Sequence, residues 1–501
     1  MINVEQSAGA SRRVLAWPRV LAALSLGLGV IIRLRQFAAG RSLWVDEAAL
    51  GLNIINRSAV ELLRPLDYLQ GAPIGYLWLA RLAVVLGGPN EWALRAVSLI
   101  SGVAALLLFA LLARRLLDEW PAALAIAILA FAPPLIYYSN ELKQYSLDVL
   151  VAVLALALFF YLRRPLTAAR VATGAVAGTV FIWLSHPALF MLAAVGLVAF
   201  VEAARRGDRR SLWLLVIIGL VWGGSVAGLS LLSLTSLTSE AALLDFWSTG
   251  FVPAPLPLVE FARWWWFKLN DLTTFTLQLS AVALVAAAAA IPSLARRDRG
   301  LLAVLLLPIG LTFVAAALRL YPFADRLLLF TTPLVALLVA EGTANLYRRL
   351  RPIGRLPAYA LVVVLLASPL LQAADLLRAP QYKEELRPVL ARLADKWEEG
   401  DRLVVYYGSY LPFEYYRTRF GFADEDIVVL ERSREDWLPY FRAMDALVAE
   451  GGRVWLLFSH VYHEGGASEE ALVVNFLYQQ GFGAAEIIQE PGASAYLFVL
   501  P

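Results

Sequence analysis

The chain has 501 residues, of which 60% are hydrophobic and 17% are charged. Soluble proteins are about 45–50% apolar and about 25% charged, so this excess of apolar residues indicates several membrane spans rather than one buried core. The formal net charge of +3 gives no reason to expect a nucleic acid partner, and the absence of cysteine excludes disulfides, thiolate catalysis and cysteine metal sites.

Eleven apolar runs approach or exceed the roughly 20 residues that a helix needs to cross a bilayer. Arg12 and Arg13 precede the first run, and no small-residue cleavage site follows it, so we expect an uncleaved first span. Pro187 interrupts the joined fifth and sixth runs and predicts a tight turn there. The runs lie near residues 14–34, 92–113, 120–138, 145–162, 169–185, 187–203, 212–234, 276–294, 301–319, 327–346 and 357–375.

The placement of arginine predicts the orientation of these spans. If the N-terminus is cytoplasmic, every inside turn carries an arginine pair, whereas the short outside turns hold little beyond Lys143 and Arg326. Cytoplasmic loops are enriched in Lys and Arg, so this alternation supports that orientation, and an odd number of spans puts the C-terminus outside. We therefore expect a multi-pass protein of the inner or plasma membrane.

Three segments lie outside the predicted spans, at residues 35–91, 235–275 and 376–501. The first is amphipathic and predicts helices at the outer interface, and the second contains three consecutive tryptophans that suit the headgroup layer. In the third, strand-like stretches alternate with helical ones, which predicts a small α/β domain. The predicted fold is a polytopic α-helical membrane domain of about eleven spans over residues 1–375, followed by an extracytoplasmic α/β domain over residues 376–501.

Two adjacent carboxylates, Asp46 and Glu47, follow Trp44 in the first outside segment. Two acids at the start of a helix also favour its N-terminal dipole, which is a purely structural explanation. However, ionisable groups beside apolar spans are costly and usually functional. A carboxylate in this place can act as a general base on an acceptor hydroxyl or amine.

A second set of polar residues lies in YYSNELKQYSLD, between the third and fourth spans. It contains Glu141, Lys143, Tyr145 and Asp148. A solvated turn can carry a few charges without any function. However, Lys143 is one of few cations in the outside turns, and Asp148 lies inside an apolar run, where an unpaired carboxylate is expensive. This pattern suits a site that binds a phosphate and uses a second carboxylate.

The remaining candidates are single residues in other outside turns. Arg319 and Arg326 flank an outside turn at the start of the tenth run, where an arginine can reach to the interface. Arg326 precedes an uninterrupted apolar run and can instead bind a phosphate bidentately. His186 is either a metal ligand or a hydrogen-bonded turn residue, and the turn residue is the simpler interpretation. His460 and His463 have an HxxH spacing, which is too weak a signal to assign a role.

Taken together, these motifs resemble the polyprenyl-phosphate-sugar-dependent glycosyltransferases of the C superfamily. The similarity covers roughly residues 14–375 and is strongest to the bacterial branch related to protein O-mannosyltransferases and lipid A aminoarabinose transferases. The matching order is W-x-D-E after the first span, P-I-G-Y-L-W and E-W-A-L-R-A before and at the second, E-x-K-x-Y-x-x-D, P-x-x-D-R-L-L-L, and a soluble tail.

The resemblance implies an inverting transfer of a sugar from an undecaprenyl-type phosphate donor to a protein, lipid or glycan acceptor outside the membrane. It makes Asp46 the general base with Glu47 in support, and matches Asp148 to a second acidic position. It also matches Lys143 and Arg326 to cations that face the donor phosphate, with Tyr145 beside them. Glu141, Arg319 and His186 remain further candidates.

The sequence also departs from this family. Aminoarabinose transferases have an acidic and a basic residue where this chain has Gly71 and Ala72, which puts a metal ligand and one phosphate contact in doubt. A divalent metal ion therefore stays open, with Asp46, Glu47 and Asp148 as the available ligands. Two other functions also remain open: a transporter or flippase of lipid-linked sugars, and a ligase or polymerase of lipid-linked glycans.

Overall fold

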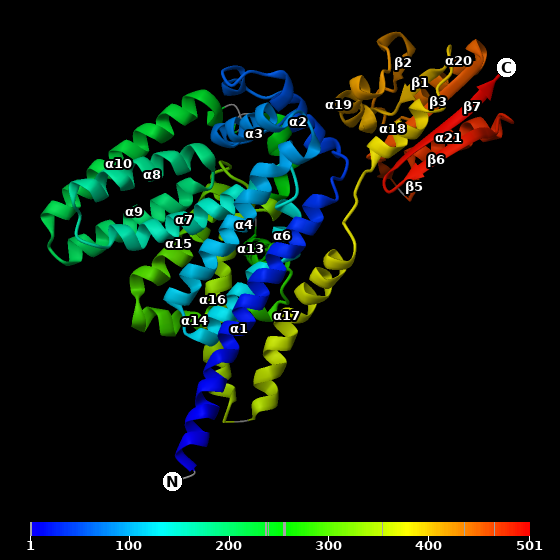
Figure 1. Cartoon of the computed structure of the whole chain (residues 1–501). Helices are drawn as coiled ribbons and strands as arrows, with labels where there is room; N and C mark the ends of the chain where they lie inside the picture. Colours follow the sequence, from blue (N-terminus) through cyan, green and yellow to red (C-terminus); the bar gives the residue numbers. More distant parts are fainter. Residues whose placement is uncertain are drawn as a thin grey trace. The chain divides into compact units, whose positions relative to one another are not determined.

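The structure is a computed structural model that describes the chain except residues 1–2, 236–237, 239, 254–256, 353, 435 and 465. The chain forms two compact units (Figure 1). The membrane unit consists of Met1–Ala38 and Arg57–Pro380, and the α/β unit consists of Ala39–Asn56 and Gln381–Pro501. A stretch that carries Asp46 and Glu47 therefore belongs to the same unit as the C-terminal residues.

Each of the eleven apolar runs forms helix in the membrane unit. Among the described residues, eight helices are long and apolar enough to cross a membrane. The count of eleven spans stays a prediction, because α5, α8 and α14 are shorter. The longer helices are α1 (Asn3–Ala38), α3 (Ile74–Gly87), α4 (Glu91–Leu116), α5 (Glu119–Phe131), α7 (Tyr145–Leu162), α8 (Ala168–Leu184), α9 (Ala188–Arg205), α10 (Arg209–Leu229), α13 (Leu258–Thr274), α14 (Val282–Arg297), α15 (Arg299–Ala317), α16 (Thr332–Leu350) and α17 (Arg355–Arg378).

Prolines divide two of the apolar runs. The third run forms two helices, α5 and the short α6 (Pro133–Tyr138), because Pro133 and Pro134 lack the amide protons that would continue α5. The predicted turn at Pro187 is confirmed, since α8 ends at Leu184 and α9 begins at Ala188. Both breaks place polar side chains at the ends of apolar helices, where a functional site can form.

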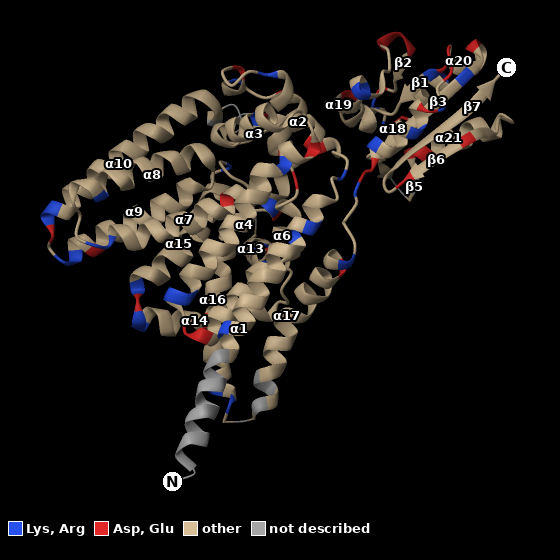
Figure 2. Cartoon of the chain, in the orientation of Figure 1, with Lys and Arg blue, Asp and Glu red and all other residues tan. Residues whose placement is uncertain are grey.

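Charged residues of the membrane unit gather at helix ends and in loops (Figure 2). Arg163, at the end of α7, binds Glu202 and Asp298 at 2.7 and 2.6 Å. This three-residue network joins the ends of α7 and α9 to the start of α15. Because each charge faces an opposite one, the network avoids the cost of an unpaired charge at the edge of the membrane.

Small residues allow the helices around α7 to approach closely. A Cβ atom on Gly102 of α4 would lie 2.1 Å from the Ser139 hydroxyl, so only glycine fits beside the turn between α6 and α7. On α16, a Cβ atom on Gly342 would lie 1.6 Å from the Ala286 carbonyl oxygen of α14. Such contacts are typical of packed membrane helices. The contact of Gly102 with Ser139 fixes the position of the α6–α7 turn.

The α/β unit is built on a five-stranded sheet with the order β2-β1-β3-β7-β6. Strands β1 (Arg402–Val405), β2 (Ile427–Val429) and β3 (Gly452–Ser459) are parallel, whereas β7 (Ala493–Leu500) and β6 (Ala484–Glu490) are antiparallel to their neighbours. A two-stranded ribbon, β4 (His463–Glu464) and β5 (Ala467–Ser468), follows β3.

Helices cover both faces of this sheet. The apolar side chains of α18 (Leu386–Ala394) and α19 (Tyr410–Phe420) pack on one face, and those of α20 (Leu438–Glu450) and α21 (Glu469–Gln479) pack on the other. The helix α2 (Val45–Asn56) packs against α19. The sequence predicts strands at residues 401–408, 425–431, 452–459 and 494–501 and helices at residues 434–451 and 468–481, and β1, β2, β3, β7, α20 and α21 confirm them among the described residues. The elements β4, β5, β6, α18 and α19 are additional.

Candidate functional site

The turn between α6 and α7 brings four of the predicted site residues together. Glu141, Lys143, Tyr145 and Asp148 are each no more than 6% exposed, so the turn is not solvated. Proline at the start of α6 and the close approach of Gly102 explain why this polar stretch is enclosed by helices. Charged side chains are buried this close together only where ion pairs or hydrogen bonds offset the cost of removing them from water.

Lys143 is held in place from two sides. Its Nζ donates a hydrogen bond to Oε1 of Gln70 at 2.8 Å, and its backbone carbonyl accepts one from the Ser98 hydroxyl at 2.9 Å. Gln70 immediately precedes Gly71 and Ala72. The neutral side-chain amide of Gln70 therefore directs the Lys143 ammonium group toward residues 70–72 of the first outside segment.

Arg326 lies against aromatic rings in the same region. Its guanidinium carbon is 5.2 Å from the ring centroid of Trp247 and 6.0 Å from that of Tyr145, at the start of η4 (Asp325–Thr331). The rings of Tyr145 and Tyr138 are 4.9 Å apart. An arginine stacked on rings keeps its charge with less water around it, which suits the binding of a phosphate.

Asp148 and the turn between α8 and α9 supply several uncommitted polar atoms. Oδ1 of Asp148, Oγ of Ser185 and Nε2 of His186 are buried, and none has a hydrogen-bond partner among the described residues. Asp148 lies beside Ser185, and Tyr321 is near enough to be affected by its charge. Buried polar atoms normally have partners, so such a group of exceptions indicates a place for a ligand or water.

The surroundings of His186 and Tyr321 determine whether these two side chains carry a charge. Burial lowers the pKa of His186 to about 4, so the imidazole is neutral near pH 7. Burial, with Asp148 and Tyr145 nearby, raises the pKa of Tyr321 well above its usual range. The Tyr321 hydroxyl donates to the Leu327 carbonyl at 3.0 Å. Both side chains are neutral hydrogen-bonding groups beside the charged ones.

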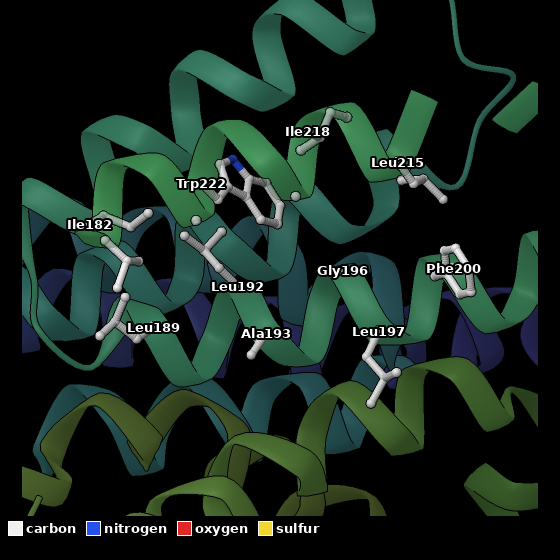
Figure 3. A pocket seen from close by; sticks show the side chains of 13 residues that line it. Ile182, Leu189, Leu192, Ala193, Gly196, Leu197, Phe200, Leu215, Ile218 and Trp222 are labelled. Atoms are coloured by element: carbon white, nitrogen blue, oxygen red, sulfur yellow. The ribbon is translucent and has the colours of Figure 1, made fainter. Parts of the chain in front are cut away.

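An apolar groove begins beside this polar cluster. Its volume is about 410 Å³, and side chains of α8, α9 and α10 line it (Figure 3). Ile182 and Leu189 lie on either side of the Ser185–Pro187 turn in the sequence and both line the groove. Gly196 and Gly219 leave the space open that larger residues would fill. The groove has the chemistry of a binding site for an alkyl or prenyl chain.

The predicted carboxylate pair lies in the α/β unit, at the first turn of α2. Asp46 is partly exposed, and Glu47 is buried. The backbone before the pair is bound to the C-terminal residues. The Val45 amide donates to Glu384 at 3.4 Å, and the Leu43 amide donates to the Tyr416 hydroxyl at 2.9 Å. These bonds fix the chain direction at the two acids.

Not all predicted residues join these groups. Arg319 is exposed and lies 5.9 Å from the ring centroid of Phe251, as expected for an arginine that reaches to the interface. Among the residues that the structure describes, no three His, Asp or Glu side chains come together as metal ligands. The sequence reasoning missed Tyr138, Ser185, Tyr321 and Trp247, which are ordinary residue types for a membrane interface and become noticeable only through their neighbours.

Comparisons with known proteins agree with this architecture. Residues 71–223 match the family model described as dolichyl-phosphate-mannose-protein mannosyltransferase. No functionally curated protein matches the chain. The structure is similar to that of ArnT from Cupriavidus metallidurans bound to undecaprenyl phosphate, with 15% identity and a TM-score of 0.50 over 96% of this chain and 98% of ArnT.

A second similar structure comes from an archaeal protein. The oligosaccharyltransferase AglB from Archaeoglobus fulgidus, in complex with an inhibitory peptide and a dolichol-phosphate, has 14% identity and a TM-score of 0.50. The match covers 80% of this chain and 63% of AglB. At these identities the two structures establish a shared fold.

Proposed function

We infer that this chain is a multi-pass membrane glycosyltransferase of the C superfamily, and we propose that it takes its sugar from a polyprenyl-phosphate donor. The family match covers residues 71–223 and includes the buried turn with Lys143 and Asp148. The fold is that of ArnT, whose structure was solved with undecaprenyl phosphate. A donor of this class carries a polar head on a long apolar tail.

The observation that carries the proposal is the polar cluster at the end of an apolar groove. Asp148 and His186 present buried polar atoms without a hydrogen-bond partner among the described residues, and Ile182 and Leu189 of the groove lining flank the Ser185–Pro187 turn. A ligand with a polar head and an apolar tail needs a polar cluster for the head and an adjoining apolar groove for the tail. We assign the groove to the prenyl tail and the cluster to the phosphate and sugar.

The donor phosphate is assigned to Lys143, Arg326 and Tyr145. Negative charge on the phosphate increases as its bond to the anomeric carbon breaks, so fixed cations stabilise the transition state more than the ground state. Lys143 and Arg326 supply these cations from the α6–α7 turn and η4, and the Tyr145 hydroxyl supplies a neutral donor. Asp148 is assigned to a hydroxyl of the donor sugar, which can donate to its open Oδ1.

The acceptor is assigned to the carboxylate pair. Asp46 accepts the proton of the attacking hydroxyl or amine, whose lone pair forms the new bond to the anomeric carbon. The bond to the phosphate oxygen breaks, and its electron pair leaves with the polyprenyl phosphate. Glu47 supports Asp46 from the same turn of α2. One displacement without a covalent intermediate inverts the anomeric configuration, so a product with retained configuration would contradict this mechanism.

The reaction is proposed to occur on the outer side of the membrane. The arginine pairs lie at the turns expected to be cytoplasmic, which supports an external C-terminus. Polyprenyl-phosphate sugars, membrane lipids and a protein, lipid or glycan acceptor are the implied partners. A flippase of lipid-linked sugars would use a similar groove, so an assay of transfer itself is needed.

The test compares Asp46→Asn with wild type in membranes supplied with a panel of radiolabelled polyprenyl-phosphate sugars. Asp67→Asn is the matched control, because Asp67 is 61% exposed and pairs with Arg57. We expect transfer by wild type and by the control, and loss of at least about 100-fold in Asp46→Asn, as for removal of a general base.

Each other outcome has a definite meaning. Equal transfer by wild type and Asp46→Asn would remove Asp46 from the mechanism. Movement of the labelled lipid across the membrane without transfer to any acceptor would favour the flippase. A parallel arm contains a chelator, and activity that is lost there and restored by a divalent cation would add a metal ion to the scheme.

A further inference from the structure

The α/β unit contains a polar cavity that the mechanism above does not use. Its volume is about 420 Å³, within the range of roughly 300–1,000 Å³ that small-molecule sites occupy. It opens beside the end of β3 and the start of β7. The polar side chains that line it are Lys383, Glu384, His460, His463, Glu470, Gln489, Glu490 and Ser494.

The sheet topology favours a ligand at this edge. β1 lies between the parallel strands β2 and β3. The connection from β1 to β2 passes over one face of the sheet by way of α19, and the connection from β2 to β3 passes over the other face by way of α20. In open α/β sheets, ligands bind beyond the carboxyl ends of the strands at such a reversal. His460 immediately follows β3, and Ala493 of β7 pairs with Ser459 at the same edge.

The carboxylates around the cavity are positioned to accept hydrogen bonds from hydroxyl or ammonium groups of a ligand. Glu470 accepts hydrogen bonds from the hydroxyls of Ser494 and Tyr496, which fix its carboxylate and leave further lone pairs available. Glu490 is fixed in a similar way by Arg392. Carboxylates outnumber cations in the lining, so an anionic ligand is disfavoured and a neutral or amino-bearing one is favoured.

One carboxylate connects the cavity to the general base. Oε1 of Glu384 lies 2.8 Å from Nδ1 of His460 in the cavity wall, and its Oε2 accepts from the Val45 amide, next to Asp46. The Lys383 ammonium lies 2.8 Å from the ring centroid of Trp44, whose ring is 6.1 Å from that of His460. A ligand in the cavity therefore contacts the same residues that hold the start of α2.

From this arrangement we propose that the cavity binds a neutral or amino-bearing saccharide unit of the acceptor. The proposal rests on the proposed function, because it makes this saccharide part of the molecule that Asp46 deprotonates. The saccharide can belong to a free glycan or to the head group of a glycolipid, since both present the same hydroxyls. A peptide acceptor would need apolar or backbone-binding surface, which this lining offers less of.

The experiment measures saccharide binding to the full chain in lipid nanodiscs by saturation-transfer NMR. The probes are methyl glycosides of neutral, amino and uronic sugars, together with a lipid-linked glycoside and a Ser/Thr-rich peptide. Gln489→Ala removes one exposed amide from the cavity, and Gln480→Ala removes an exposed amide elsewhere on the same unit. We expect Gln489→Ala to weaken binding of neutral or amino glycosides by roughly five- to tenfold, as for one lost hydrogen bond, and Gln480→Ala to leave it unchanged.

A kinetic measurement separates this proposal from the proposed function. Gln489→Ala should raise the KM for a saccharide acceptor by a similar factor. Sugar transfer to an acceptor without measurable glycoside binding to wild type would overturn the cavity assignment and leave the glycosyltransferase intact. Glycoside binding that depends on Gln489 in a protein that transfers no sugar would instead remove the proposed function.

The remaining outcomes concern the class of ligand. Preference for the uronic glycoside would contradict the charge argument. Binding of the peptide, weakened by Gln489→Ala, with no binding of glycosides would overturn the saccharide assignment in favour of a peptide acceptor. Binding of the lipid-linked glycoside but not the soluble one would support the assignment with a glycolipid as the source.

Discussion

Arg326 and Arg319 show how residues of one type in one loop acquire different roles. Both flank the turn between α15 and α16 in the sequence. Arg326 was expected as a phosphate ligand, and Arg319 was a further candidate without an assigned role. Arg326 lies close to the rings of both Trp247 and Tyr145, whereas Arg319 is exposed beside Phe251. Spacing in the sequence does not distinguish the two, because the difference arises from η3 (Ser248–Gly250) and its neighbours, about 70 residues earlier.

This contrast gives a matched pair of substitutions. Arg326→Lys keeps the charge but loses the planar group that stacks on rings and binds phosphate bidentately, so we expect donor KM to rise by roughly tenfold. Arg319→Lys should leave donor KM unchanged. Transfer kinetics at varied donor concentration measure both. Equal effects of the two substitutions would remove Arg326 from the donor site.

Asp401 offers a second prediction at this scale, concerning stability. Burial alone would raise the pKa of Asp401, but hydrogen bonds from Arg453, the Glu398 amide and Trp455 outweigh it, so the pKa lies below its usual value. A carboxyl with a lowered pKa stabilises the fold above its unfolded pKa of about 3.9, and this contribution is lost as the pH falls through the folded value. Asp401→Asn should therefore reduce the free energy of unfolding of the α/β unit by roughly 1–3 kcal/mol at pH 7.

Hydrogen exchange of the full chain measures this change. Peptides from β1 and β3 should exchange faster in Asp401→Asn at pH 7, and the difference from wild type should shrink below about pH 4. Asp424→Asn is the control, because Asp424 is 82% exposed and its pair with Arg417 contributes little. A difference that persists unchanged at low pH would mean that Asp401 acts through packing rather than charge.

At the scale of elements, hydropathy alone located most helices of the membrane unit. Apolar runs of about 20 residues sufficed, because a helix in lipid must satisfy its backbone internally, and Pro187 marked the break between α8 and α9. The division between α5 and α6 was missed even though Pro133 and Pro134 stand within the run. In the α/β unit, α19 was missed because its sequence, YLPFEYYRTRF, lacks a clear apolar period and is defined by packing on the sheet.

The groove between α9 and α10 leads to a prediction about the donor tail. Gly219→Leu fills the groove, since a Cβ atom there meets nothing within 4 Å, and Gly224→Leu places the same side chain on α10 outside the groove. A displaced tail moves into lipid that is equally apolar, so only packing is lost. We expect Gly219→Leu to raise the KM of a long-chain donor by roughly three- to tenfold.

A short-chain donor provides the control for this substitution. A donor of one or two prenyl units does not fill the groove, so its KM should be the same in wild type, Gly219→Leu and Gly224→Leu. If Gly219→Leu impairs short and long donors equally, the substitution disturbs the helix bundle and the groove does not hold the tail.

At the scale of the whole molecule, the membership of residues 39–56 in the α/β unit was beyond sequence reasoning. The hydroxyl of Ser42 donates to Glu385 at 3.0 Å, across more than 300 residues of chain. The hydrogen bonds from Leu43 and Val45 to Tyr416 and Glu384 are of the same kind. No periodicity or motif in the sequence indicates hydrogen bonds between residues this far apart in the chain. The carboxylate pair was found from its residue types, but its support by the C-terminal residues was not.

The orientation of the chain can be tested directly because it contains no cysteine. A single cysteine at Gln480, exposed on the α/β unit, and one at Arg206, exposed between α9 and α10, report the two predicted sides of the membrane. A maleimide that does not cross membranes should label Gln480→Cys in spheroplasts, and Arg206→Cys only after permeabilisation. This result follows from arginine pairs at the inside turns and an odd number of spans. Labelling of Arg206→Cys alone in intact spheroplasts would invert the topology and place the acceptor reaction on the cytoplasmic side. Labelling of both would mean an even number of spans between the two positions, so that either at least one of α10, α14, α15, α16 and α17 does not cross or α13 crosses in addition to them.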